Sequence, residues 1–452
     1  MISNFLGTLV DLVWGPALVF LLIGGGIYLL LLSKLVPLTA FSHALKLVRG
    51  KYHHKNDAAD RGQINHFQDL CNALAATVGL GNIGGVAVAI QQGGPGAIFW
   101  MWVAAFIGMN TKFFECTLAV MFRGTDHNNE VQGGPMYVIE KALPKPMKFL
   151  GIAFAIFGLL GTLALFQVNQ LAAYMDSQYH VDKLLVGIVC AIFVGYVLLG
   201  GVRRMAFINA KLVPIMCVLY IFFCLVILGL NITVVPSLFG EIFRQAFRPD
   251  AVWGGAAGYG VLKVLQIGVK RAAFSNEAGV GTAPMAHGNA KTSEPVSEGL
   301  VAMMGPLLDT LIVCTLTALV ILVNFPEAAL IKEEGVLLTL AAFEKSLPTV
   351  GGYFLGLSIV LFSISTMIGM SNYNIKCWNY LFKGKKFLAE KTHVALFCLT
   401  IILGAIFEMS DIVNLLDIGY GLMAWPSMIC TIWLAPKVKK ELKRYLKEYV
   451  RE

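Results

Sequence analysis

The chain has 452 residues, of which 57% are hydrophobic and only 14% are charged, and its mean hydropathy is +0.72. Soluble globular proteins carry about 25% charged residues, so the composition excludes a soluble protein of several domains. The net charge of +8 would suit nucleic acid or anionic lipid, and the placement of that charge along the chain decides between them.

Long apolar segments recur from one end of the chain to the other. Residues 12–32, for example, are numerous and apolar enough to cross a hydrocarbon core of about 30 Å. Each segment is expected to be helical, because an open sheet leaves backbone groups unsatisfied in lipid. The sequence therefore predicts an all-α polytopic membrane protein with about 11 transmembrane helices. The predicted spans are 5–33, 67–92, 95–122, 149–175, 183–200, 208–231, 254–284, 298–324, 350–382, 389–407 and 411–435.

The basic residues are distributed unevenly between the two sets of loops. Most of the 35 lysines and arginines lie in the loops after alternate spans, beginning with the first, and in the tail 437–452. The opposite loops hold only Lys183, Arg244, Arg248, Lys332 and Lys345. This bias places the rich side in the cytoplasm, with the N-terminus outside and the C-terminus inside. The charge is therefore a topology signal, and nucleic-acid binding is unsupported.

Two smaller features complete the outline. The nine cysteines lie in or beside apolar segments without C-x-x-C spacing, which is typical of core residues and not of a disulfide or metal framework.

Two amphipathic segments, 235–247 and 328–347, lie in outer loops. Either could be an interfacial helix or a lid, and we favour interfacial helices.

A glycine-rich stretch, "ATVGLGNIGG" at residues 76–85, contains the letters G-x-G-x-x-G. A dinucleotide-binding loop needs a preceding strand and an acidic residue about 20 positions on, whereas here the next acid is Glu115 and the stretch lies within an apolar span. Two interpretations remain. Gly81 and Gly85 could permit close helix packing, or the helix could unwind beside the polar Asn82.

A second interruption decides between these interpretations. Residues 272–284, "AAFSNEAGVGTAP", break another apolar span five spans later. Paired broken helices one repeat apart point to the central site of a secondary transporter. We therefore expect an extra N-terminal helix and basic linker (1–65), two five-helix inverted repeats (66–231 and 232–436) and a basic cytoplasmic tail (437–452).

The chemistry of broken helices suggests the kind of substrate. The N–H groups exposed at a half-helix carry partial positive charge and suit a carboxylate. Carbonyls freed at the other half-helix suit Na⁺, a hard cation that prefers oxygen. A site that offers both fits a zwitterion carried together with a cation, and an amino acid is the simplest candidate.

Several sequence blocks resemble the alanine or glycine:cation symporter family, also called sodium:alanine symporters. They include "ALAATVGLGNIGGVAVAI", "GGPGAIFWMW", "TKFFECTL", "QGGPMYVIEKAL" and "FSNEAGVGTAP", and the match runs from about residue 66 to 382. The resemblance implies a leucine-transporter-type five-plus-five fold with one extra N-terminal helix. It also implies Na⁺-driven import of a small neutral amino acid, chiefly alanine or glycine, by a monomer in a prokaryotic plasma membrane, with no organic cofactor.

The resemblance also implies site residues. The substrate carboxylate should meet the backbone at the first break, beside polar and apolar walls from the third helix, with the second break facing the ammonium group. The implied substrate residues are Thr77, Gly79, Leu80, Gly81, Asn82, Phe166, Gln167, Phe274, Ser275, Asn276 and Met370. The implied Na⁺ ligands are the carbonyls of Ala75 and Val78 and the hydroxyls of Ser365 and Thr366.

The chain departs from the family pattern at positions that bear on selectivity. Leu80 stands where many members have threonine, and Met370 and Asn372 stand where aromatic residues are usual. An unbranched methionine adapts to its surroundings more than a rigid tryptophan does. A different or larger amino acid, or coupling to H⁺, therefore remains an alternative.

Charged residues within the spans have two interpretations each. Glu277 could bind a cation or proton, or it could be held by freed N–H groups or by Lys270 or Arg271. Asp309 could relay a cation or make a structural hydrogen bond.

Other polar residues receive structural interpretations. Lys112 and Glu115, three apart, are expected to form an internal ion pair. His53, His54 and His66 lack convincing metal-ligand spacing and are expected to be solvated.

Two other classes of protein are weighed against transport. A membrane-embedded enzyme would need a convergent nucleophile and base or a metal cluster, and the sequence contains neither H-E-x-x-H nor G-x-S-x-G. An ion channel could line its pore with the paired breaks, but it would conduct without saturation by an amino acid.

Overall fold

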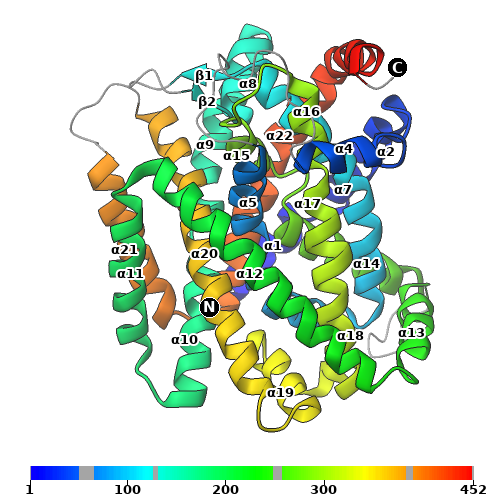
Figure 1. The fold of residues 1–452 in the computed structure, drawn as a ribbon, viewed down its shortest axis with the longest axis vertical. Coiled ribbons are helices and arrows are strands. Elements are labelled where there is room, and N and C mark those ends of the chain that lie inside the picture. The colour runs from blue at the N-terminus through cyan, green and yellow to red at the C-terminus, as the bar shows by residue number, and fades with distance from the viewer. Residues whose placement is uncertain (1, 50–65, 126–130, 248–256, 383–389, 450–452) are drawn as a thin grey trace.

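The computed structural model describes residues 2–49, 66–125, 131–247, 257–382 and 390–449, and these ranges are almost entirely helical. The described strands are β1 (Gly124–Thr125) and β2 (Val131–Gln132), which pair antiparallel. The all-α fold class predicted from the sequence is confirmed. Figure 1 shows the helices packed around one another, with the long helix α20 (Gly351–Leu381) near the middle of the view.

Within the described residues each of the predicted spans is helical, apart from short breaks within several of them. The first half of the chain contains α1 (Ile2–Val13), α2 (Pro16–Leu32), α3 (Val36–Thr39), α4 (Phe41–Val48), α5 (His66–Thr77), the π-helical turn η1 (Gly81–Gly85), α6 (Val86–Gly93), α7 (Gly96–Met121), α8 (Pro135–Ala142), η2 (Lys145–Met147), α9 (Phe149–Gly161), α10 (Leu165–Tyr179), α11 (Lys183–Leu198) and α12 (Gly201–Leu230). The second half contains α13 (Val235–Phe247), α14 (Ala257–Asn276), α15 (Ala283–His287), α16 (Pro295–Ala302), α17 (Met304–Pro306), η4 (Leu307–Cys314), α18 (Thr315–Asn324), η5 (Ala328–Leu330), α19 (Val336–Ser346), α20, α21 (Glu390–Ile406) and α22 (Met409–Tyr449).

Length and composition identify which helices can cross a membrane. Among the described residues six helical segments are long and apolar enough, and two bent pairs raise the total to eight. One bent pair is α1 with α2, which meet at 40°, because Pro16 begins the second helix and cannot extend the first. The other is the predicted first break, where α5 meets the η1–α6 segment at 52°.

The second predicted break separates α14 from α15. Between them the backbone takes left-handed angles at Glu277 (φ 60°), Gly279 (φ 83°) and Gly281 (φ 91°), which ends the helix because a right-handed helix requires negative φ. The first half, α14, packs on α6, whereas the second half, α15, packs on α5. The two broken spans therefore run in opposite directions, as an inverted repeat requires.

The segment 328–347 is a lid and not the interfacial helix that we favoured. The α19 residues Val336, Leu338 and Thr339 have no exposed surface, and the helix packs on η1 and α20. The Thr339 hydroxyl donates to the Ile83 carbonyl at 3.2 Å. This contact places α19 directly over the first break, at the opposite end of the molecule from β1 and β2 (Figure 1).

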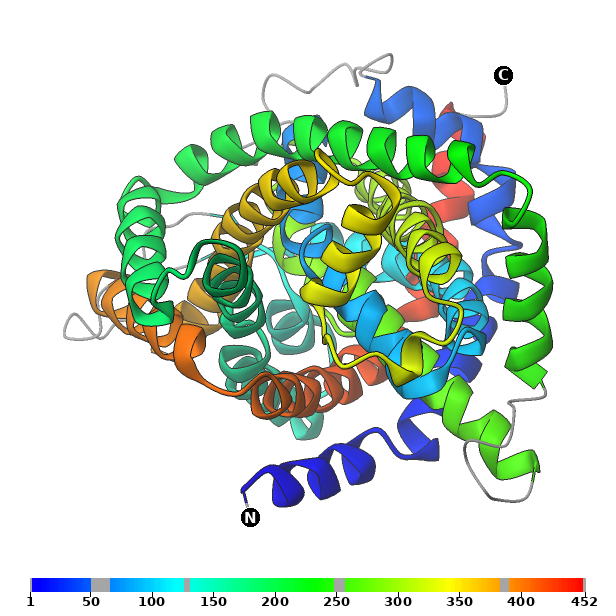
Figure 2. The ribbon, with the colours of Figure 1, turned by 90° about the horizontal axis from the view of Figure 1, so that it is seen from below.

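The other amphipathic segment, α13, keeps the character of an interfacial helix. Its Phe239, Phe243 and Phe247 side chains are 41–54% exposed. It packs along α7, where the Trp100 indole donates to the Ala246 carbonyl at 3.2 Å. Viewed from below, in Figure 2, α13 lies at the periphery whereas the yellow α19 lies near the centre.

A buried ion pair joins α14 to the C-terminal helix α22. Arg271 contacts the Asp417 carboxylate, and Lys270 lies 3.2 Å from it. The sequence interpretation that placed these cations beside Glu277 is therefore wrong. The Trp14 indole donates to the Asp417 carbonyl at 2.8 Å. The extra N-terminal segment therefore contacts α22 at the same residue as the ion pair does.

Removing the Asp417 charge should destabilise the fold. Asp417→Asn leaves the Arg271 guanidinium buried without its anion, and breaking a buried pair costs about 3–5 kcal/mol. We expect a melting temperature several degrees lower in detergent, measured by thermal shift. The control is Asp176→Asn, which removes an exposed pair with Lys183 and should change stability by less than about 1 kcal/mol. Equal effects of the two substitutions would contradict the structural role of Asp417.

Candidate functional site

A cavity lies between the two broken spans, and the space among the atoms that line it, parts open to the surroundings included, is about 300 Å³. Its walls come from α5, α9, α10, α14, α20 and α22 and from the bends between them. The lining residues are Ala76, Thr77, Gly79, Gly81, Gly161, Leu163, Gln167, Phe274, Thr366, Met370, Leu416 and Tyr420. Six predicted substrate residues and one predicted Na⁺ ligand are therefore brought together around one space.

At the first break, a hydrogen bond to a side chain takes the place of a backbone hydrogen bond of the helix, and neighbouring backbone N–H and C=O groups lose their helical partners. The Gly79 N–H donates to the Asn82 side-chain oxygen at 2.8 Å instead of continuing the helix. Within the described residues, the N–H groups of Leu80 and Gly81 donate to no backbone carbonyl, and none of the backbone N–H groups donates to the carbonyls of Ala75 or Val78. Two donors and two acceptors are thus freed within a single bend.

The second break frees carbonyls in the same way. The Ala278 N–H donates to the Asn276 side chain at 3.0 Å, and the Gly279 N–H donates to Glu115 at 3.2 Å. These N–H groups would otherwise bond to the carbonyls of Phe274 and Ser275, four residues earlier. The Phe274 carbonyl lies 4.0 Å from the position of a Cβ atom built on Gly81, so it faces the first break.

The two glycines of the first break have different neighbours. A Cβ atom on Gly79 would lie 2.2 Å from the Thr366 hydroxyl oxygen, which is an impossible contact, whereas one on Gly81 would lie 3.4 Å from the Phe274 ring. Gly79 is therefore required by the close approach of α20, and Gly81 borders the cavity itself.

Of the predicted Na⁺ ligands, Thr366 lies at this contact between α5 and α20. The Thr366 hydroxyl is buried and has no hydrogen-bond partner among the described residues. Its neighbour Ser365 is also buried, and its hydroxyl donates to the Phe362 carbonyl at 3.1 Å.

Several predicted substrate residues turn away from the cavity into a buried polar cluster. The Asp309 carboxylate accepts hydrogen bonds from Asn82, from Ser275 at 2.6 Å and from Thr310 at 2.8 Å. Asn276 donates to Thr310 at 3.0 Å. This cluster holds the two breaks against η4, and it shows Asp309 making the structural hydrogen bonds that we considered.

Of the residues predicted to line the site, some border the cavity and others pack behind those that do. Phe166 meets Phe274 edge to face, with 5.5 Å between ring centroids, and stands behind it. Leu80 is fully buried and does not line the cavity. Gln167 does line it, and no residue in the described part of the chain forms a hydrogen bond with its buried side-chain oxygen.

Tyr420 is the main lining residue that sequence reasoning missed. It comes from α22, far along the chain, and its hydroxyl donates to Glu277 at 3.2 Å. Its ring lies 5.5 Å from that of Phe274. The available signal was the sequence Gly419-Tyr420-Gly421 within an apolar span.

The two glutamates near the second break differ from expectation. Glu277 accepts from Thr282 at 2.7 Å as well as from Tyr420. Glu115 accepts from Ser427 at 2.6 Å and from the Gly279 N–H. The predicted ion pair of Glu115 with Lys112 is not formed among the described residues, because the Glu115 carboxylate accepts hydrogen bonds from Ser427 and from the second break instead.

Other sequence interpretations concern cysteines and histidines. All nine cysteines are free, as predicted. His53 and His54 lie outside the described residues. His66 is the first residue of α5.

Comparisons with known proteins identify the family of the chain. The model of the sodium:alanine symporter family matches residues 1–452. The sodium/alanine symporter AgcS of Methanococcus maripaludis is 41% identical, with 98% of this chain and 97% of that protein covered. The probable sodium/glutamine symporter GlnT of Bacillus subtilis is 34% identical, with 99% and 91% covered.

Solved structures share the fold at low sequence identity. The crystal structure of MhsT in complex with L-phenylalanine has a TM-score of 0.57 and 14% identity, covering 85% of this chain and 99% of that one. This likeness confirms the leucine-transporter-type architecture. With the family match over the whole chain and the site between paired broken helices, the chain belongs to the sodium:alanine symporter family and is a multi-pass secondary amino-acid transporter, not an enzyme.

Proposed function

We propose that the chain imports a small neutral amino acid, alanine or glycine, together with Na⁺. The observation that carries this proposal is the pairing of freed backbone groups at one bend. The N–H groups of Leu80 and Gly81 suit a carboxylate, and the carbonyls of Ala75 and Val78 suit a hard cation. The names of AgcS and GlnT, which specify sodium, support the same coupling.

The amino acid is proposed to lie across the cavity between the two breaks. Its carboxylate binds the backbone N–H groups of Gly81, which lines the cavity beside Thr77, and of the buried neighbour Leu80. Its ammonium group binds the freed carbonyls of Phe274 and Ser275. The side chain points toward Met370 and Gln167, which line the same cavity. Gly79 and Asn82 shape the first bend, whereas Phe166 and Asn276 support the walls from behind.

Na⁺ is proposed to bind between α5 and α20, held by the carbonyls of Ala75 and Val78 and the hydroxyls of Ser365 and Thr366. The unpartnered Thr366 hydroxyl supports this placement. Ala75 and Val78 belong to the bend that binds the carboxylate. Binding of Na⁺ would therefore stabilise the conformation of the bend that binds the amino acid, and binding of the amino acid would stabilise the conformation that binds Na⁺, which is a reciprocal coupling.

The remaining organisation follows the same proposal. The chain acts as a monomer in a prokaryotic plasma membrane, with its N-terminus outside, and α19 closes the site from the outer side. Residues 66–231 and 232–436 are the two inverted repeats that exchange access between the sides. A larger amino acid is the second candidate, favoured by the flexible Met370 side chain in the wall.

Uptake by purified protein tests the proposal directly. Proteoliposomes loaded with K⁺ and diluted into Na⁺ should accumulate labelled alanine or glycine, because the inward Na⁺ gradient drives both ligands. The control is dilution into choline, which should give no accumulation. Absence of uptake of every amino acid under both Na⁺ and H⁺ gradients would refute the function.

The hydroxyls of α20 test the Na⁺ site. We expect Ser365→Ala combined with Thr366→Ala to raise the Na⁺ concentration for half-maximal uptake at least about tenfold, a loss of about 1.4 kcal/mol. The control is Ser358→Ala on the same helix, whose hydroxyl donates only to the Phe354 carbonyl at 3.0 Å in the described structure. Unchanged Na⁺ dependence in the double variant would refute this site.

Met370 tests substrate selection. Met370→Trp fills part of the cavity, so uptake should persist for glycine and alanine and fall for larger amino acids that the native chain accepts. A competition assay over the common amino acids measures this change. Met370→Leu conserves volume and should leave the preference unchanged. An identical preference in the tryptophan variant would show that Met370 does not face the substrate.

A further inference from the structure

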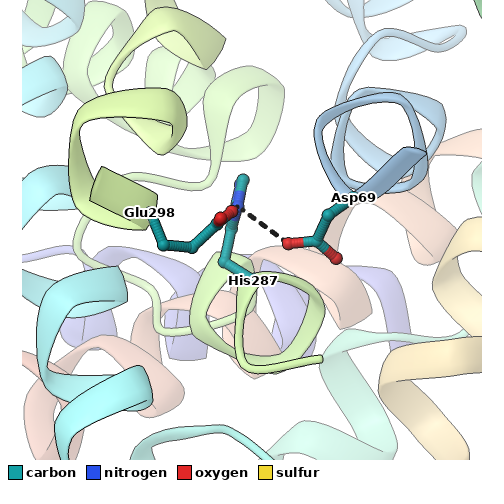
Figure 3. A group of neighbouring side chains, drawn as sticks. All are labelled: Asp69, His287 and Glu298. Carbon is teal, nitrogen blue, oxygen red and sulfur yellow. Dashed lines mark hydrogen bonds and ion pairs between the residues drawn. The ribbon is translucent and has the colours of Figure 1, made fainter. Parts of the chain in front are cut away.

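Three buried ionisable side chains meet away from the substrate cavity, each from a different segment. Asp69 comes from the first turn of α5, His287 from the end of α15 and Glu298 from α16 (Figure 3). The His287 Nδ1 atom lies 2.6 Å from a Glu298 oxygen and 3.2 Å from an Asp69 oxygen. All three side chains are 0–1% exposed.

Asp69 is incompletely satisfied in this arrangement. Neither of its carboxylate oxygens receives a hydrogen bond from the described residues, and its charged contact there is with His287. A buried carboxylate is costly unless it is paired and fully hydrogen-bonded or binds a metal. One of these oxygens points toward the His287 ring (Figure 3), so the cluster offers acceptor capacity at its centre.

The donor set has the composition of a transition-metal site. It provides one imidazole nitrogen and carboxylate oxygens from two residues, and all three ligand atoms lie within 4.8 Å of one another. Imidazole with carboxylates suits zinc and its neighbours more than Na⁺ or Mg²⁺. Two carboxylates and a neutral imidazole would also be neutralised by one dication.

The distances are close to those that a bound ion requires. Ligand atoms at about 2.0–2.2 Å from a tetrahedral zinc lie roughly 3.3–3.5 Å apart. The contact between His287 and Asp69 nearly meets this spacing, and the contact between His287 and Glu298 must open by less than about 1 Å. The ion would replace the Nδ1 proton that now lies between the carboxylates, so binding releases protons.

We propose that Asp69, His287 and Glu298 form a binding site for a divalent transition-metal ion of the zinc class. The site is distinct from the Na⁺ site, because Asp69 precedes Ala75 by six residues, about 9 Å along the helix. The ion would join one half of each broken span, α5 and α15, to the helix α16. It would thereby hold together segments that must separate if this side of the transporter opens.

Zinc binding to the purified full-length chain, prepared without a histidine tag, tests the site. Isothermal titration calorimetry should show one Zn²⁺ per chain with proton release that depends on the buffer. His287→Gln and Asp69→Asn, each of similar size to the native residue, should weaken binding at least about tenfold. The matched control is His180→Gln, which removes an exposed histidine and should leave the affinity unchanged.

X-ray absorption on the zinc-loaded native chain provides a test that does not depend on the folding of variants. The spectrum should show a single imidazole in a shell of nitrogen and oxygen ligands at about 2.0–2.1 Å. A shell without imidazole, a shell with several imidazoles, or no saturable zinc binding would overturn the proposal. Unchanged affinity in a folded His287→Gln variant would overturn it as well.

Discussion

The structure depends on one constraint, which is that a helix can break inside a membrane only if its freed backbone groups find partners. Side chains close to each break in space supply them. Asn82 accepts from the Gly79 N–H at the first break, and Asn276 and Glu115 accept from the Ala278 and Gly279 N–H groups at the second. Within the described residues, these replacement hydrogen bonds leave a few other backbone groups without a backbone partner, and two of the residues that carry such groups, Gly81 and Phe274, line the cavity.

The same constraint explains why the breaks are so tightly packed. Asn82 also donates to Asp309, so the side chain that stabilises the first bend is itself held by η4. The helix α19 then covers the first break through the hydrogen bond from Thr339 to the Ile83 carbonyl. A small movement at either break must therefore disturb α19, η4 or α20, which is how local binding can reach the whole fold.

The sequence was sufficient to predict features that are local in the chain. Both breaks and the small residues at their centres could be read directly from residues 76–85 and 272–284. Thr366 was found through its motif, and the structure places it in the cavity wall. Prediction failed where a contact joins distant segments, because no local pattern reports that Tyr420 meets Glu277 or that His287 meets Asp69.

A related failure concerns the direction in which side chains point. Residues 274–276 are consecutive, and all three were assigned to the substrate site, yet a helix turns each successive side chain by about 100°. Phe274 consequently lines the cavity, whereas Ser275 points to Asp309. In the proposed binding mode Ser275 contributes to the substrate through its carbonyl, so removing its hydroxyl should affect the bend and not the ammonium contact. Selectivity is left to the few side chains that do face the cavity, and Met370 is the most adaptable of them.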